Sequence, residues 1–333
     1  MTVLNRRGFT LGTLALAGLA GGMLAATPAL GQTAFPNKPV TIVVGFPAGG
    51  PTDVYARAVA EGLTTLWKQP VLVENRPGAS GTIGGVRVIR APADGYTLSF
   101  TNNATNGAYE QLNTKFTGYK TMTDFVPVAL FGVVPTVLVV RGSLPVKNMA
   151  EFVAYAKSKP GAITYGSSAT GSAPHLASEL LSDATGIKML HVPYPGAAPL
   201  MTALLGEQLD MYVGGASTVM DHVRSGRIKA LATLHPTRLK AAPDVPTLLE
   251  QGIKGSDYAS WFGFVAAAAT PAAILDQINA DIRQVMDAPA MKEKLAKFGV
   301  EYASVDRAGF WKVVEEEYTR AGRVIREQKL TVD

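Results

Sequence analysis

Short apolar runs of strand length alternate with longer, helix-like runs along almost the whole of this 333-residue chain. The alternation predicts an α/β fold, because strands separated by helices pair into mostly parallel sheets with helices on both faces. The strand candidates are residues 40–46, 71–74, 96–101, 128–131, 137–140, 163–166, 189–192, 209–213, 230–234, 261–266 and 300–303. The helix candidates are residues 52–66, 149–158, 174–184, 199–205, 271–286, 289–298 and 307–328.

Two long extended runs indicate that the chain crosses between two lobes. The first covers residues 125–140 and is interrupted at Pro135, and the second covers residues 256–266. A chain that leaves one lobe, builds another and returns must cross twice, and the cleft between such lobes is a natural ligand site. We therefore expect lobe 1 to contain residues 35–133 and 259–328, and lobe 2 to contain residues 134–258.

Composition limits the class of protein further. With 47% apolar and 17% charged residues, the chain can bury a full core. It has no cysteine, which excludes disulfides, thiol nucleophiles and cysteine metal sites. It has no basic run interleaved with aromatic residues, so nucleic acid is not an expected partner.

Residues 1–31 have the pattern of an export signal. Arg6 and Arg7 precede an uncharged run over residues 8–26, and a small-residue exit ends at Gly31, where we expect cleavage. The segment Asn5-Arg6-Arg7-Gly8-Phe9 also fits a twin-arginine signal, and a general secretory signal is the alternative. Removing two arginines and no acid lowers the formal net charge from +5 to +3. The mature protein is expected in the periplasm.

The run VTIVVGFPAGGPTDVYAR, residues 40–57, reads as a buried strand, a glycine loop and the start of a helix. Pro47, Gly49 and Gly50 turn the backbone. The helix that follows offers free N–H groups and the positive end of its dipole to an anion. Pro51 stands where a nucleotide-binding loop needs its lysine, which argues against nucleoside triphosphates. An ordinary tight strand-to-helix turn is the alternative.

A second corner of the same kind follows the strand candidate at residues 163–166. Its hydroxyl-rich loop precedes a helix with Pro174 in its first turn and His175 beside it. If the two corners face each other, two helix N-termini meet one ligand, and neutral donors of this kind suit a carboxylate. Local capping is the alternative for the serines. The candidate ligand residues of this loop are Ser167, Ser168, Thr170, Gly171 and Ser172.

Other loops follow predicted strands and could reach the same cleft, although each taken alone is also compatible with a simple turn. They contribute the candidates Ser80, Asn102, Tyr194, Gly196, Ala197, Gly214 and Gly215.

The residues that could carry catalysis are few. Asp53 is either a general base or a first-turn carboxylate that complements the helix dipole. A serine hydrolase that uses Ser168 with His175 is an alternative function, although no third residue to orient the histidine and no G-x-S-x-G elbow is evident. The four histidines lack metal-ligand spacing, so we expect no metal and no cofactor. The acidic run at residues 315–317 indicates a solvated helix face.

Seven segments spread over the chain resemble one known family. They are FPAGGPTDVYAR, VENRPGASGTIGG, ADGYTLSF, YGSSATGSAPHLASELL, HVPYPGAAPLMTALLGEQLD, APDVPTLLEQG and SWFGFVAAAATPAAI. They occur in the order seen in the Bug-type extracytoplasmic solute receptors of tripartite tricarboxylate transporters. The resemblance extends from residue 35 to about residue 328.

This resemblance implies a two-lobed periplasmic binding protein fold (type II) that closes on a small organic carboxylate, with no cofactor and no reaction. It implies that backbone and hydroxyl donors hold one carboxylate, while ordered water helps to read the distal end of the ligand. It also implies membrane permease subunits as partners. A sensor kinase that recognises the loaded receptor is an alternative partner, and a monomer is expected. The matching positions are Gly49, Gly50, Asn102, Ser167, Ser168, Thr170, Gly171, Ser172, Tyr194, Gly196 and Ala197.

One position departs from the family pattern. After residues 209–213, many relatives have an Asp followed by Asn, whereas this chain has Gly214 and Gly215. Loss of that carboxylate argues against an amino acid ligand. Two glycines are also expected to leave space, so we expect a dicarboxylate or a bulkier, aromatic carboxylate.

Overall fold

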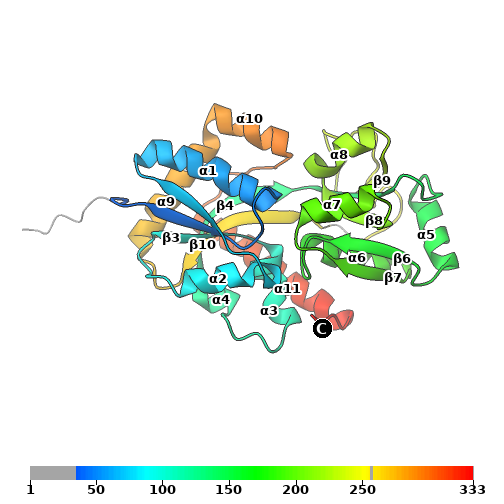
Figure 1. Ribbon diagram of the computed structural model, residues 1–333, viewed down its shortest axis with the longest axis horizontal. Coiled ribbons are helices and arrows are strands. Elements are labelled where there is room, and N and C mark those ends of the chain that lie inside the picture. The colour runs from blue at the N-terminus through cyan, green and yellow to red at the C-terminus, as the bar shows by residue number, and fades with distance from the viewer. Residues whose placement is uncertain (1–34, 256–257, 333) are drawn as a thin grey trace, which may run out of the picture. The chain divides into compact units, whose positions relative to one another are not determined.

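The computed structural model describes residues 35–255 and 258–332. Residues 38–333 form one compact unit, and this unit is built on two five-stranded sheets with helices on their faces (Figure 1). The predicted export signal at residues 1–31 lies outside the described residues. Among the helices of the described residues, none is long and apolar enough to cross a membrane.

The first sheet has the strand order β2-β1-β3-β10-β4. Strand β1 is parallel to β2 and β3, whereas β10 is antiparallel to both β3 and β4. The bounds of its strands are β1 Val40–Val44, β2 Val71–Asn75, β3 Thr97–Asn102, β4 Phe125–Val134 and β10 Ser260–Ala267.

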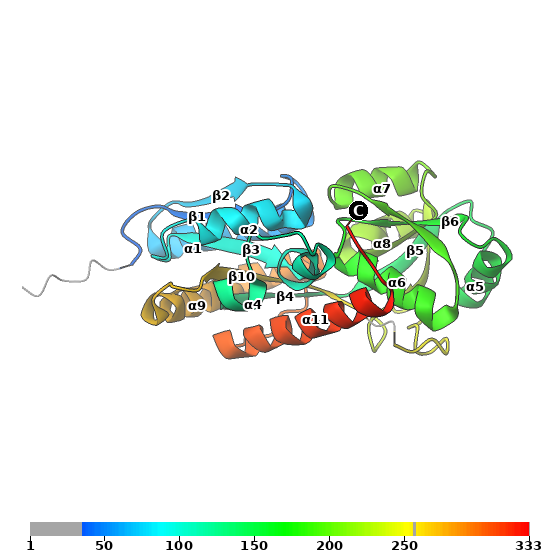
Figure 2. The same cartoon turned by 90° about the horizontal axis from the view of Figure 1, so that it is seen from below.

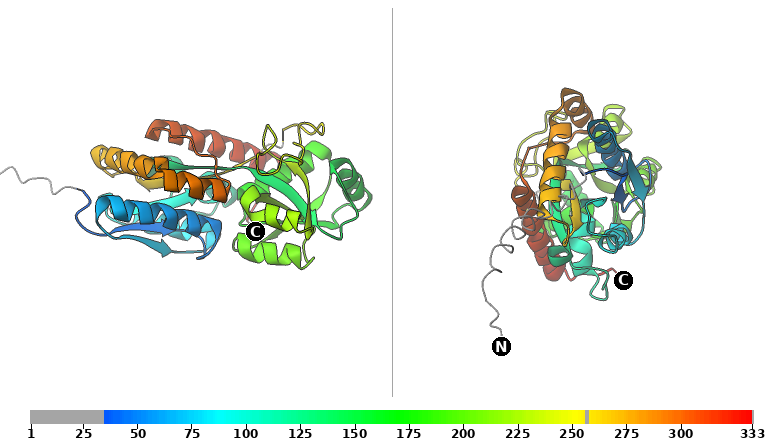
Figure 3. Two further views of the ribbon diagram at one scale, coloured as in Figure 1. Left: turned by 90° about the horizontal axis from the view of Figure 1, so that it is seen from above. Right: turned by 90° about the vertical axis from the view of Figure 1, so that its left-hand side faces the viewer.

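Helices cover both faces of the first sheet. On one face, α1 and α9 lie side by side (Figure 3), with α10 next to α9. On the other face lie α2 and α11 (Figure 1). The bounds are α1 Pro51–Trp67, α2 Thr82–Ile89, α3 Tyr109–Leu112, α4 Thr121–Asp124, α9 Ala272–Asp287, α10 Pro289–Phe298 and α11 Arg307–Glu327, with a 3₁₀ turn at Ala79–Gly81 and a π-helical turn at Ala104–Ala108.

Successive side chains of β10 point to opposite faces of this sheet and pack into an apolar core on each face. Phe262 lies on the α1 side, where its ring centroid is 5.2 Å from that of Tyr55. Trp261 points the opposite way and packs edge-on against Phe310 of α11, with ring centroids 5.7 Å apart. Successive side chains of a strand point to opposite faces, so one strand serves two layers of aromatic packing.

The second sheet has the order β7-β6-β8-β5-β9. Strand β6 is parallel to β7 and β8, whereas β5 is antiparallel to β8 and β9. Its elements are β5 Thr136–Arg141, α5 Met149–Ser158, β6 Ile163–Ser167, α6 Ala173–Thr185, β7 Met189–Pro193, α7 Ala197–Leu205, β8 Met211–Gly215, α8 Ala216–Arg224 and β9 Ile228–Thr233.

The C-terminal helix α11 belongs to the cores of both sheets. Phe310 and Val314, near its start, are buried against the first sheet. Ala321, Val324 and Ile325, near its end, are buried in the core of the second sheet. Figure 2 shows the helix running along both halves of the unit.

The sheets contain more antiparallel pairing than the alternation predicts. Strands β4 and β5 carry the chain from one sheet to the other through Pro135, and β10 carries it back. Strands β10 and β5 each run against both of their neighbours, because a strand that enters from the other sheet need not follow the βαβ rule. The strand expected at residues 300–303 is wrong, since Glu301 forms only an isolated bridge with Val133.

Helix α2 was not among the predicted helices, and its glycines explain why. Gly84 and Gly85 lower the helix propensity of the segment. A Cβ atom at Gly84 would lie 3.0 Å from the Cα atom of Gly45, and one at Gly85 would lie 2.6 Å from the ring of Tyr119. The glycines let α2 approach the sheet closely.

Truncating Phe310 tests the packing of α11. This fully buried ring fills the space beside Gly263, so we expect Phe310→Ala to lower the free energy of unfolding by about 3–5 kcal/mol. Urea denaturation measures this, with Lys312→Ala on the exposed side of the same helix as the control. Equal stability of the two variants would contradict the assignment.

Candidate functional site

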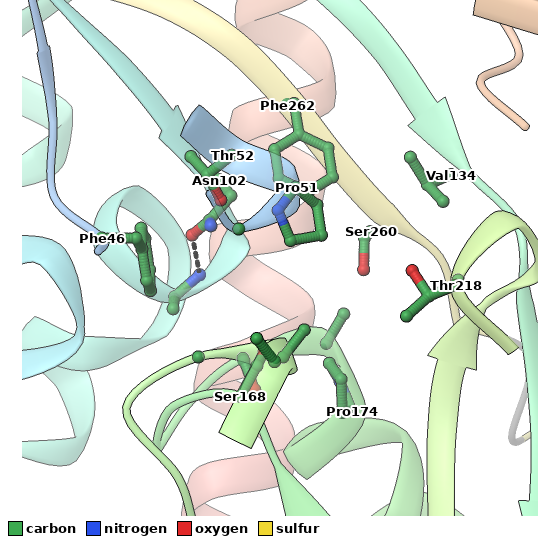
Figure 4. A pocket seen from close by; sticks show the side chains of 18 of the residues that line it. Phe46, Pro51, Thr52, Asn102, Val134, Ser168, Pro174, Thr218, Ser260 and Phe262 are labelled. Atoms are coloured by element: carbon green, nitrogen blue, oxygen red, sulfur yellow. Dashed lines mark hydrogen bonds between the residues drawn. The ribbon is translucent and has the colours of Figure 1, made fainter. Parts of the chain in front are cut away.

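A cavity of about 320 Å³ lies between the two sheets (Figure 4). Ser168 and Pro174 from the second half lie across from Pro51 and Asn102 of the first. The lining residues are Phe46, Pro47, Ala48, Gly50, Pro51, Thr52, Tyr55, Asn102, Asn103, Ala104, Val134, Ser168, Ser172, Ala173, Pro174, Pro195, Gly196, Ala197, Ala198, Pro199, Tyr212, Gly215, Thr218, Ser260 and Phe262.

Four helices begin at this pocket. Helices α1, α6, α7 and α8 follow directly from β1, β6, β7 and β8, and residues at the start of each helix line the cavity. At none of these four N-termini does the N-cap residue make a capping side-chain hydrogen bond, because it is a glycine in α1, α7 and α8 and a serine without such a bond in α6. The positive ends of four helix dipoles therefore point toward one small volume.

The described lining residues include no Asp, Glu, Lys, Arg or His. Phe46, Tyr55, Val134 and Phe262 provide much of the apolar wall. The polar positions of the lining are hydroxyl groups and asparagine side chains. They belong to Ser168, Ser172, Thr52, Thr218, Ser260, Asn102 and Asn103. The pocket can therefore hold an anion through backbone dipoles and neutral donors, and can hold an apolar body beside it.

Ser172 is the most distinctive polar group in the lining. The residue is 6% exposed, and its buried Oγ atom has no hydrogen-bond partner. It occupies the N-cap position of α6 but makes no side-chain capping bond. Its hydroxyl makes no hydrogen bond within the described protein, so a ligand group that reached it would satisfy a buried polar atom.

The two asparagines at the end of β3 are fixed by the backbone. Asn102 Oδ1 accepts a hydrogen bond from the Ala104 N–H at 3.0 Å, drawn as the dashed line in Figure 4. Asn103 Oδ1 accepts one from the Trp261 N–H at 2.9 Å. The second bond links the pocket wall to β10, where the chain returns to the first sheet.

Glu317 lies behind Asn103 on α11, which corrects the expectation of a solvated face for residues 315–317. Its Oε1 atom is buried without a hydrogen-bond partner. Burial raises the pKa of Glu317 to about 7, although a hydrogen bond with Asn103 and the charge of Arg320 act in the opposite direction. Glu315 and Glu316 are exposed as predicted.

About half of the residues expected at the site line the cavity, namely Pro47, Gly50, Asn102, Ser168, Ser172, Gly196, Ala197 and Gly215. Gly49 lines a neighbouring depression between α1, α7 and α8. The other candidates, Asp53, Ser80, Ser167, Thr170, Gly171, His175, Tyr194 and Gly214, stand behind the lining.

Asp53 secures the glycine loop from behind. Its carboxylate accepts hydrogen bonds from the Gly49 N–H at 2.9 Å, from Arg57 Nε at 2.9 Å and from Asn75 Nδ2 at 2.9 Å. Burial opposes ionisation, but the hydrogen bonds from Arg57, Gly49 and Asn75 outweigh it and hold the pKa of Asp53 below its ordinary value. With these partners, the carboxylate shapes the loop.

Ser80 joins the two halves beside the pocket. Its Oγ atom donates to the Thr170 carbonyl at 2.9 Å, which ties the turn after β2 to the loop of residues 167–172, called the serine loop below. Gly171 of that loop has φ +78°, and a Cβ atom there would lie 2.7 Å from Leu112 Cδ1. A glycine is thus required both by the backbone and by the close contact. Tyr194 supports the same loop by donating its N–H to the Ser167 carbonyl at 2.9 Å.

Gly214 does not create room in the pocket, so the expectation drawn from its small size is wrong. A Cβ atom at Gly214 would lie 2.4 Å from Tyr212 Cε1 and 2.6 Å from Val219 Cγ1. The space beside it is already filled by core side chains.

Sequence reasoning missed the aromatic wall and the far hydroxyls. Phe46 and Phe262 belonged to predicted strands, and Tyr55 to a predicted helix, without a signal that they face a ligand cavity. Thr218 lies three residues after the candidate Gly215, and Ser260 lies in the second crossover run. The extended run around Phe262 was a usable signal, because the first crossover strand, β4, ends at the pocket and the returning strand, β10, begins there.

Comparison with known proteins identifies the family. The chain matches the family described as tripartite tricarboxylate transporter family receptor over residues 55–330, and it belongs to that family. BugT of Bordetella pertussis (strain Tohama I) is 34% identical over 317 residues, covering 94% of each chain. Receptors of this family are periplasmic solute-binding proteins and not enzymes, so the hydrolase alternative with Ser168 and His175 is wrong.

Solved structures agree with the fold. R. palustris Rpa4515, solved with adipate, has a TM-score of 0.84 and 32% identity, covering 89% of this chain and 99% of that one. MatC from Rhodopseudomonas palustris, solved with bound malate, has a TM-score of 0.81 and 31% identity, covering 87% and 100%. The predicted two-sheet α/β binding-protein fold is therefore confirmed. No group of three His, Cys, Asp or Glu side chains within the described residues could hold a metal ion.

Replacing Asp53 by asparagine tests its role behind the glycine loop. We expect Asp53→Asn to lower the free energy of unfolding at pH 7 by about 1–3 kcal/mol. A carboxylate with a lowered pKa stabilises the fold above its unfolded pKa of about 3.9, and this stabilisation is lost as the pH falls through the folded pKa. The difference from wild type should therefore shrink toward pH 3.

Urea denaturation at both pH values measures this difference. Asp221→Asn, at an exposed aspartate of α8, is the control. A loss of stability for Asp53→Asn that is the same at pH 7 and at pH 3 would contradict the role of the charge.

Proposed function

We propose that this protein captures a small organic carboxylate in the cavity between its two sheets and delivers it to the membrane permease of a tripartite tricarboxylate transporter. The observation that carries the proposal is the convergence of four uncapped helix N-termini on a pocket whose described lining has no charged side chain. Such a site favours an anion that is small enough to be enclosed.

Hydrogen-bond chemistry supports a carboxylate as that anion. Ser168 and Ser172 line the cavity together with the first turns of α1 and α6, and Ser172 Oγ has no protein partner. A carboxylate accepts several hydrogen bonds, and each charge-assisted bond contributes about 1.5–3 kcal/mol. We assign one carboxylate of the ligand to this end of the pocket.

The rest of the lining favours an apolar ligand body. Phe46 and Phe262 line the cavity, and five prolines from the surrounding loops and helix starts add to the apolar surface. At the other end, Ser260 and Thr218 present hydroxyl groups near Val134 (Figure 4). A dicarboxylate with a hydrocarbon chain or an aromatic carboxylate would match this distribution. The neighbours solved with adipate and malate support a carboxylate in this chain too.

Delivery to the transporter requires export, and we infer that residues 1–31 direct it. Family receptors are periplasmic and work with tripartite transporters. The charge pattern at Arg6 and Arg7, with the small-residue exit at Gly31, supports an export signal cleaved near that glycine. The loaded receptor would then dock on permease subunits in the membrane.

A carboxylate screen with a serine variant tests the proposed site. We expect at least one of adipate, malate and benzoate to raise the melting temperature of the purified protein, because a ligand that binds only the folded state stabilises it. Ser172→Ala should weaken binding of that acid roughly 10- to 150-fold, which corresponds to one charge-assisted bond. The stability of the ligand-free variant should be unchanged or higher, because the removed hydroxyl has no partner.

Isothermal titration calorimetry measures the affinities, and Ser158→Ala at the exposed end of α5 is the matched control. Gly50→Val is a second variant. A Cβ atom at Gly50 would lie 3.6 Å from the Pro47 carbonyl oxygen, an ordinary contact that the fold accepts, and Gly50 lines the cavity, where a larger side chain takes up room. If no acid of the panel binds, or if the Ser172 and Gly50 variants bind like wild type, the proposed function is contradicted.

A further inference from the structure

Two histidines stack face to face behind the serine loop. His175 lies in the first turn of α6 and His191 lies on β7, and their ring centroids are 4.0 Å apart with an interplanar angle of 11°. The Tyr165 ring of β6 stacks on His191 at 5.0 Å. His175 is 3% exposed, and neither histidine lines the cavity. The site as described so far does not use this stack.

Each imidazole holds one end of the serine loop. His175 Nδ1 accepts a hydrogen bond from the Gly171 N–H at 3.0 Å. His191 Nε2 lies 2.7 Å from Ser167 Oγ. Ser168 and Ser172, the two hydroxyl residues of this loop that line the pocket, each directly follow a residue held in this way.

These contacts determine which ring nitrogen carries the proton. His175 must leave Nδ1 unprotonated to accept from Gly171, so a neutral ring carries its proton on Nε2. Ser167 Oγ donates its own hydrogen to the Ala169 carbonyl at 3.0 Å, so it can only accept from His191. His191 therefore also carries its proton on Nε2. A second proton on His175 would remove the acceptor for the Gly171 N–H.

The groups that face the histidines also favour neutral rings. Burial, with a smaller contribution from the neighbouring His191, lowers the pKa of His175 to about 3. Burial lowers the pKa of His191 to about 4. Glu179 Oε1 lies 4.0 Å from His175 Nε2, but it also accepts from the Tyr165 hydroxyl, and burial raises the pKa of Glu179. Glu179 is therefore a weak counter-charge for a protonated His175.

We propose that His175 and His191, each with a proton on Nε2, are positioning residues that hold the serine loop in its ligand-accepting shape, and that His175 can do so only as a neutral imidazole. The proposal rests on the proposed function for the identity of the site, but the loop geometry itself does not depend on a ligand.

Acid should release the loop. A base whose pKa is lowered in the folded protein stabilises the fold above its unfolded pKa of about 6.5. That stabilisation is progressively lost as the pH falls from about 6.5 toward the folded pKa. Hydrogen exchange of the Gly171 amide should therefore lose protection over this range, after correction for the intrinsic rate.

The first test uses the ligand-free protein. In wild type at pH 7.5, ¹⁵N NMR of the imidazoles should show both histidines protonated on Nε2 only, and the Gly171 amide should be protected. His175→Leu should speed its exchange at least about 10-fold, whereas His175→Asn, whose Oδ1 can replace Nδ1 as acceptor, should restore protection. His235→Leu, at a histidine after β9, is the control for loss of an imidazole and should leave Gly171 unaffected.

The outcomes separate this proposal from the proposed function. A proton on Nδ1 of His175, or equal Gly171 protection in wild type and His175→Leu, would overturn the positioning role. The tautomer in wild type decides the matter alone if His175→Leu does not fold. With adipate as the probe, His175→Leu should bind at least about 10-fold more weakly than His175→Asn. If adipate, malate and benzoate all fail to bind wild type while the tautomers and protection are as stated, the proposed function fails and the loop assignment stands.

Discussion

The direction of four strands organises the ligand pocket of this protein. Strands β1, β6, β7 and β8 each end at the cavity, and the helix that follows each strand begins there. In a sheet of parallel strands, carboxyl ends share one edge, so the N-termini of α6, α7 and α8 gather without any specific contact between them. The first sheet contributes α1 from the other side. Positive potential in the pocket is thus a product of topology, and the lining needs no lysine or arginine to receive an anion.

The groups that meet the ligand are supported by groups that do not. Asp53 bonds to Gly49 behind the glycine loop, and Ser80 bonds to Thr170 beside the serine loop. His175 and His191 bond to Gly171 and Ser167 from the rear. Several residues that the sequence pattern places at the site therefore do not line the cavity but support the loops that do. Short loops of small residues have little packing of their own, so their shape depends on these buried partners.

Local patterns in the sequence predicted most elements but not their pairing. Helices α5 and α10 have the predicted bounds, because caps and prolines mark their ends locally. The antiparallel course of β5 and β10 was not predicted, since strand neighbours are set by tertiary packing. Helix α2 could not be predicted, because the glycines that let it pack closely against the sheet also lower its helix propensity. Pocket residues next to glycine and serine corners were predictable, whereas Phe46 and Phe262 look like ordinary core residues until the sheets are assembled. The stacking of His175 on His191 likewise depends on the parallel pairing of β6 with β7.

Helix α11 is packed into the apolar cores of both halves and therefore connects them. Its first turns are buried with Phe310 in one core, and its last turns with Val324 and Ile325 in the other. To move one sheet far from the other, α11 must bend or its end must leave an apolar core. Small rotations of the sheets therefore cost much less free energy than a wide separation. Because α11 is buried in both cores, we expect the stabilities of the two halves to be coupled. A ligand bound at the centre would thereby protect two of the edge strands, β2 and β9, from proteolysis, although it touches neither.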